Sequence, residues 1–384
     1  MIELGHLGAI VSTNSHRVIK KIIPWRERSC SFPVIAMSGH NGAVHAGRAG
    51  KPVEGMGEGW GQPPHNASVC GTIQLSPRFQ TKICSARPVK RDHEEYPMPD
   101  LSRMPAAFIG HGSPMNTLEV NDFTRSWREL GRIMPRPRAV LAISAHWFIQ
   151  STAVTAMAQP RVIHDFYGFP AELFAFQYPA AGSPEVAEEI VEVVRPGHVE
   201  LDQDSWGIDH GTWSVLAHVF PAADIPVLQL SIHAGAPLSY HVELGARLAP
   251  LRERGVFILG SGNVVHNLRR VDWSYGDRGF DWCERFDLHV RSVMTSDPAA
   301  LAAVEEHPDY RQAVPTTEHF IPLAYLAGLC TAAGETARPF AEGCTLGSLS
   351  MTSYLLGMQP PMTSSHGDAA QSMPTRVAPE LTNT

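Results

Sequence analysis

The sequence predicts a single α/β domain in which a largely parallel central sheet is flanked by helices. Short apolar segments such as MPAAFIG and RAVLAIS, which end in glycine or serine, are typical of buried parallel strands. Amphipathic segments with helical spacing separate these strands, and such alternation favours one α/β domain, which we place at residues 104–357. Because ligands of open α/β sheets bind beyond the carboxyl ends of the strands, we expect the active site at that edge.

Local signals position the individual elements. The predicted strands lie at residues 104–110, 138–144, 226–232 and 256–262. The predicted helices lie at residues 121–134, from 183 onward, at 239–254 and at 320–330. Asn121 is a predicted N-cap, and Ser183 followed by Pro184 supplies a cap residue and a proline at the first helical position. Gly255 is expected to end the third helix at its C′ position.

The two ends of the chain differ from this pattern. Residues 1–103 lack apolar periodicity and contain the glycine-rich segment GMGEGWGQPP, so we expect a disordered extension or sequence translated from a mis-assigned start. The polar, Pro- and Ser-rich residues 358–384 are expected to form a disordered tail.

Composition narrows the class of protein. A net charge of −7 and scattered basic residues give no footprint for nucleic acid, so we expect small-molecule partners. Six cysteines without a CxxC pair fit a reducing compartment, and no secretory signal is visible, so we expect a cytoplasmic protein. The longest apolar stretch, residues 321–333, is too short to span a bilayer, and no membrane association is expected.

Histidine is the unusual residue of this chain, which contains 19 of them. Three lie just after predicted strands, namely His111, His146 and His266, and His319 precedes the last predicted helix. Each alone is ordinarily a hydrogen-bonding loop residue, but their joint position at one sheet edge points to metal binding. Neutral imidazole is the commonest protein metal ligand, and a catalytic metal needs several fixed ligands and an open position.

Two more histidines, His164 and His210, adjoin an aspartate, which can orient a ring as a second-shell carboxylate does. Other catalytic signatures are absent from the sequence. It contains neither the GxSxG of a nucleophile elbow nor the HExxH of a metalloprotease, and it has no P-loop and no GxGxxG after a strand.

Six segments occur in a characteristic order: GHGSPMN, SAHWF, IHDFYGFP, WGIDHGTW, SGNVVHNL and TTEHFIPL. In this order they resemble the 4,5-DOPA extradiol dioxygenase family of class III ring-cleaving dioxygenases, over residues 104–356. The resemblance implies an α/β fold related to the catalytic subunit of protocatechuate 4,5-dioxygenase, with a non-haem Fe(II) centre that holds zinc in some members. By motif, His111, His146, His266 and His319 fall on metal-site positions of the family and His210 on a second-sphere position.

This resemblance implies that O₂ is inserted into a DOPA-like catechol with ring opening. A non-ligating histidine suits the proton transfers, which gives His210 and His266 catalytic roles and leaves His266 either a ligand or an acid/base. A histidine-rich site departs from the usual iron site of two histidines and one carboxylate. Glu318 and Asp209 are the only nearby candidates for such a carboxylate. A site made of histidines alone also suits Zn(II). The alternatives are a zinc-dependent hydrolase and a non-catalytic metal-binding relative.

Overall fold

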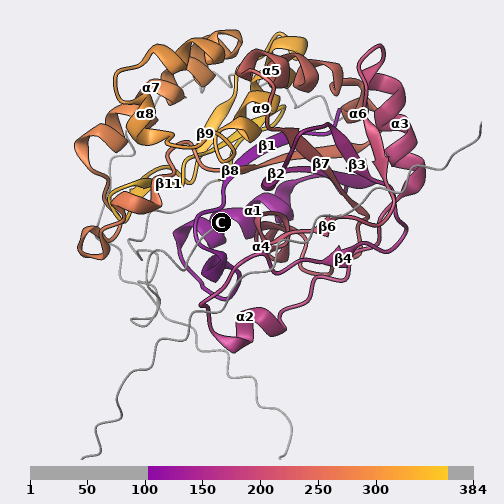
Figure 1. Ribbon diagram of the computed structural model, residues 1–384, viewed down its shortest axis with the longest axis horizontal. Coiled ribbons are helices and arrows are strands. Elements are labelled where there is room, and N and C mark those ends of the chain that lie inside the picture. Colours follow the sequence, from indigo (N-terminus) through magenta and orange to yellow (C-terminus); the bar gives the residue numbers. More distant parts are fainter. Residues whose placement is uncertain (1–102, 362–384) are drawn as a thin grey trace, which may run out of the picture. The chain divides into compact units, whose positions relative to one another are not determined.

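The structure, a computed structural model, describes residues 103–361 (Figure 1). The segments 1–102 and 362–384, for which disorder is expected, lie outside the described residues. Within residues 103–361 the main sheet has eight strands in the order β5-β3-β7-β2-β8-β1-β12-β9. Helices lie on both sides of this sheet (Figure 1), which confirms the predicted α/β fold.

The centre of the sheet is parallel. Strands β7 (Val227–His233), β2 (Ala139–Ile149), β8 (Val256–Gly262) and β1 (Ala106–Gly110) pair in that order, all parallel. Beyond β7, strand β3 (Ala153–Thr155) pairs antiparallel with β7, and β5 (Glu200–Asp202) pairs parallel with β3. Beyond β1, strand β12 (Ser353–Leu356) pairs antiparallel with β1, and β9 (Arg338–Phe340) pairs antiparallel with β12. The small pairs are β4 (Arg161–Val162) with β6 (Gly207–Ile208) and β10 (Cys344–Thr345) with β11 (Leu349–Ser350).

The helices divide between the two faces. One face is covered by α3 (Pro184–Val194), α5 (Leu238–Arg247), α6 (Pro250–Glu253), α7 (Asp281–Ser296), α8 (Tyr310–Ala313) and α9 (Ile321–Ala333). The other carries α1 (Asp122–Ile133), α2 (Ala171–Ala175) and α4 (His210–Val219). Short 3₁₀ helices lie at Pro114–Thr117 (η1), Leu268–Arg270 (η2), Trp273–Tyr275 (η3) and Pro298–Glu306 (η4).

Each face of the sheet has its own hydrophobic core, because successive side chains of a strand point to opposite faces. In β8, Val256 and Ile258 belong to the core beneath α5 and α9, whereas Phe257 and Leu259 belong to the core beneath α1 and α4. All four side chains are at most 1% exposed. The strands that carry the site are therefore fixed from both sides.

Local signals were accurate for the helix starts. Asn121 forms a capping box with Thr124 at the start of α1, and the Ser183 hydroxyl accepts from the backbone amide of Val186 at the start of α3. The helix predicted at 239–254 is instead two helices, α5 and α6. Pro250 has no amide hydrogen to continue the first helix, and it begins the second one.

No helix in the part of the chain that the structure describes combines the length and the hydropathy that a membrane span requires.

Candidate active site

Loops at the carboxyl edge of the parallel strands carry three of the predicted histidines. His111 follows β1 directly, His266 follows β8 after three residues, and His319 precedes α9. Backbone hydrogen bonds join these loops: the His111 amide donates to Gly262 O at 3.0 Å, and the Asn263 amide donates to His319 O at 2.9 Å. The predicted convergence at this edge is confirmed.

His146 lies inside a strand rather than after one. Strand β2 continues to Ile149, beyond the predicted end at 144, and its register against β7 shifts between Ile143 and Phe148. Such an irregularity at a functional edge re-aims a side chain. His210 is the first residue of α4, and the next residue must be glycine. A Cβ at Gly211 would lie 2.6 Å from both His146 Cδ2 and Ser144 Oγ.

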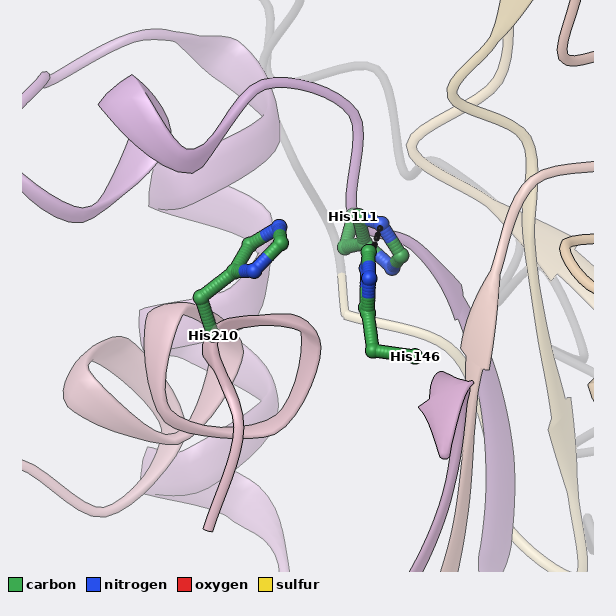
Figure 2. Close-up of side chains that lie close together, drawn as sticks. All are labelled: His111, His146 and His210. Atoms are coloured by element: carbon green, nitrogen blue, oxygen red, sulfur yellow. Dashed lines mark hydrogen bonds between the residues drawn. The ribbon is translucent and has the colours of Figure 1, made fainter. Parts of the chain in front are cut away.

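Four imidazoles meet at this edge. The ring of His111 lies 5.2 Å from that of His146, 6.1 Å from that of His210 and 5.4 Å from that of His319, measured between centroids. The rings of His146 and His210 are 4.0 Å apart. Figure 2 shows His210 reaching from the start of its helix toward His111 and His146, which lie on the sheet side. We call these four residues the histidine cluster.

Hydrogen bonding fixes which nitrogen of His111 carries the proton. Its Nδ1 lies 3.0 Å from Ser261 Oγ, and the Ser261 hydroxyl already donates to the carbonyl of Gly211 at 2.5 Å. Ser261 therefore accepts from His111, so Nδ1 of His111 is protonated and its Nε2 presents a lone pair.

Asp165 fixes two more rings. Its Oδ1 accepts from Nδ1 of His210 at 2.8 Å and from the His210 amide at 3.1 Å. Its Oδ2 lies 3.3 Å from Nδ1 of His146. Burial alone would raise the pKa of this carboxyl, but His210 and His146 hold that pKa well below its usual range. The carboxylate is thus ionised and accepts from Nδ1 of both rings, which fixes the orientation of both.

The remaining ring, His319, has the same arrangement, because its Nδ1 lies 3.3 Å from Glu318 Oε1. The Nε2 atoms of His210 and His319 are buried and have no hydrogen-bond partner among the described residues. Nε2 of His146 lies only 3.3 Å from Nε2 of His111, and with both Nδ1 atoms protonated these are two facing lone pairs. A cation removes this conflict, so the residues fit a bound metal ion.

The protonation of the cluster agrees with this fit. Burial lowers the pKa of His111, His146 and His319 well below the ordinary 6.5, and neighbouring imidazoles lower it further. Burial, with a smaller contribution from His210, also lowers the pKa of His266 to about 3. These rings are therefore neutral near pH 7, as metal ligands must be.

His266 differs from the four cluster members. Its ring stacks on that of His319, with centroids 3.5 Å apart and planes 8° apart, and it is one of the residues that line a cavity. The possible ligand atoms of His266, Glu318 and His319 lie within 4.8 Å of one another, as do those of His111, His146 and His210.

Two adjoining cavities open beside the cluster. The His266 cavity also touches Gly112, Phe169, Leu268 and Val271, and its other walls are apolar or small. The second, which we call the Glu119 cavity, shares Ser113, Trp273, Leu346 and Leu349 with the first. They contain about 400 and 440 Å³ of space free of protein atoms, open solvent at their mouths included.

The acidic neighbours behave differently from the sequence expectation. Asp165 orients His210 and His146 rather than the adjacent His164, whose Nε2 donates to Phe176 O at 2.8 Å. Asp209 does not face the cluster: its carboxylate caps α4 and accepts from Gln229 and Trp206. Burial raises its pKa to about 6.

Sequence reasoning missed Ser261, Glu119 and Trp273 as site residues. Ser261 stands in the GSG segment that ends β8, but nothing local to that segment links it to His111. The cavity residues come from segments about 150 residues apart, so only the fold brings them together.

Comparison with known proteins agrees with the geometry. Residues 105–349 match the family model described as the catalytic LigB subunit of aromatic ring-opening dioxygenase. A 4,5-DOPA dioxygenase extradiol of Escherichia coli K12 is 46% identical over 264 residues, which is 67% of this chain and 96% of that protein. A protein of the same name from Beta vulgaris is 36% identical, over 60% of this chain and 87% of its own length.

Among solved structures, the crystal structure of an uncharacterized Escherichia coli K12 protein is similar, with a TM-score of 0.58 and 41% identity. The similarity covers 66% of this chain and all of that chain.

Proposed function

Since this chain belongs to the family of catalytic LigB subunits of aromatic ring-opening dioxygenases and is an extradiol ring-cleaving enzyme, we propose that it inserts O₂ into a catechol at a mononuclear metal centre. The observation that carries the proposal is the histidine cluster, in which four buried or half-buried rings meet and each has its Nδ1 engaged by a neighbouring side chain. The related enzymes are named for DOPA, and a DOPA-like catechol is the substrate class that we propose.

We assign the metal to His111, His146 and His319, with Fe(II) as the active ion and Zn(II) able to take the same site. The neutral imidazoles suit both ions, of which zinc lies higher in the affinity order. When bound, Fe(II) supplies electron transfer between the aromatic ring and dioxygen, which side chains alone do not provide and zinc does not support.

Proton transfer is assigned to His210 and His266. Asp165 accepts from Nδ1 of His210, so its negative charge orients that ring and stabilises the imidazolium that forms when Nε2 takes a proton. His266 lines the cavity in which we place the catechol ring, and its ring is neutral near pH 7, as an acceptor of a hydroxyl proton must be. The other walls of this cavity are apolar or small.

Metal content and turnover together test these assignments. The full chain, loaded with Fe(II) under anaerobic conditions, should hold about one ion per chain and form a ring-opened product from a catechol in air. Alanine at His111, His146 or His319 should remove most of the metal. Alanine at His210 or His266 should retain the metal and reduce turnover about 10²–10⁴-fold.

The exposed His198, whose side chain is 84% accessible, provides the matched control, because His198→Ala should change neither quantity. Metal loss in His266→Ala would make His266 a ligand instead. If the zinc-loaded chain hydrolyses ester or amide substrates while the iron-loaded chain opens no ring, the alternative of a zinc hydrolase is correct.

A further inference from the structure

The two adjoining cavities contain only two titratable side chains among the residues that line them. One is His266, beside the histidine cluster, and the other is Glu119, in the second cavity. No arginine or lysine lines either cavity in the part of the chain that the structure describes. The Glu119 cavity has no other charged side chain among its lining residues, so its acidic group favours a positively charged part of a ligand there.

Glu119 is held in place but carries no counter-charge. Its amide donates to Met115 O at 3.1 Å, and its carbonyl accepts from the Thr124 hydroxyl at 3.1 Å, so the backbone is anchored on both sides. Its carboxylate forms no ion pair with any described residue. Partial burial raises the pKa of Glu119, and a hydrogen bond with the Asn121 side chain acts in the opposite direction.

Trp273 joins this carboxylate to the rest of the site. It begins η3, is partly buried, and lines both the His266 cavity and the Glu119 cavity. An indole face attracts cations, and Trp is the best of the aromatic residues at doing so. A carboxylate and an indole that border one space together form a receptor for an ammonium group.

We propose that Glu119 and Trp273 form a subsite for the ammonium group on the side chain of an aromatic substrate whose ring lies beside His266. The assignment rests on the proposed function, because it takes the His266 cavity as the place of the ring. A carboxylate on the same side chain meets no cation in these cavities and is repelled by Glu119. The site therefore selects for the amine and not for the acid of an amino-acid-like substrate.

Four catechols with matched rings separate these charges: dopamine carries the amine alone, dihydroxyphenylpropionate the acid alone, DOPA both, and ethylcatechol neither. Dissociation constants are measured without O₂ on the full-length, Fe(II)-loaded protein by quenching of tryptophan fluorescence, and kcat/KM is measured afterwards in air. Dopamine should bind at least about tenfold more tightly than ethylcatechol, as expected for a charge-assisted hydrogen bond. Dihydroxyphenylpropionate should bind more weakly than ethylcatechol.

Variants then locate the effect, with ethylcatechol as the internal reference for each protein. Glu119→Gln should reduce the dopamine-to-ethylcatechol affinity ratio to about one, and Glu119→Asp, which keeps the charge, should restore part of it. Trp273→Leu should lower the ratio, whereas Trp273→Phe should retain more of it. Glu188→Gln, on the exposed side of α3, removes the same charge far from the cavities and should leave the ratio unchanged.

The outcomes distinguish this proposal from the proposed function. A ratio near one in the unaltered protein, a ratio that survives Glu119→Gln, or no binding of any of the four catechols would overturn the ammonium subsite. Binding with the expected ratio, but no ring opening by the iron-loaded protein, would leave the subsite standing and refute the dioxygenase activity on these substrates.

Discussion

Replacing Asp165 by asparagine should weaken metal binding without unfolding the protein. Oδ1 of Asp165 accepts from both the amide and Nδ1 of His210, so the amide oxygen of asparagine will take that position. The amide NH₂ then faces Nδ1 of His146, 3.3 Å from the present Oδ2. Two donors cannot pair, so His146 must move its proton from Nδ1 to Nε2, where it occupies the lone pair that the metal needs.

The size of this effect follows from the role of such outer-shell carboxylates. Loss of one typically costs about 10–100-fold in metal affinity, which corresponds to about 1.4–2.8 kcal/mol. Anaerobic competition between the protein and a coloured chelator for Zn(II) measures that affinity independently of turnover. The exposed Asp204, whose carboxylate forms no hydrogen bond among the described residues, gives the control Asp204→Asn. Equal zinc affinities for Asp165→Asn and the unaltered chain, within about twofold, would refute the reasoning.

Three further predictions concern single contacts. Ser261→Ala leaves Nδ1 of His111 without its acceptor and should lower zinc affinity by about tenfold in the same competition assay. In Gly328→Ala the added Cβ would overlap the carbonyl oxygen of Val242, where α9 packs against α5. Urea unfolding should therefore show a free energy of unfolding lower by about 1–3 kcal/mol, despite the better helix propensity of alanine. An unchanged free energy of unfolding would mean that the two helices separate freely. Burial raises the pKa of Asp287 above 3.8, so the folded state holds the proton of this carboxyl more tightly than the unfolded state does. The free energy of unfolding should therefore fall as pH rises from 3.8 through the raised pKa. Urea titrations between about pH 4 and about pH 7 should show this fall for the unaltered protein and not for Asp287→Asn, and equal slopes for both proteins would contradict the prediction.

The elements that sequence predicted well are those set by neighbouring residues. Asn121 and Ser183 cap their helices through amides three residues away, so the signal and its effect lie in one short segment. Apolar periodicity likewise placed β8 at residues 256–262. The extension of β2 past residue 144 was not predictable in this way, because it depends on a register shift against β7, a strand about 90 residues further along the chain.

The positions of the histidine cluster were predictable from local sequence, whereas the hydrogen-bond partners of its rings were not. Strand-end positions indicated His111 and His146 of the cluster, and His266 beside it, since loops at one sheet edge converge in any parallel α/β fold. The partner of each ring was beyond local reasoning. Asp165 adjoins His164 in sequence, yet it pairs with His210, 45 residues away, because β4 and β6 bring those two loops together.

We propose that the histidine cluster holds a metal at which dioxygen enters an aromatic ring. The most direct measurement is the mass of the product formed from a catechol by the Fe(II)-loaded full chain under isotopically labelled dioxygen. The iron-loaded protein should form a ring-opened product that carries both labelled oxygen atoms, and neither the zinc-loaded protein nor His111→Ala should form it. A product without label, or equal product from His111→Ala, would contradict it.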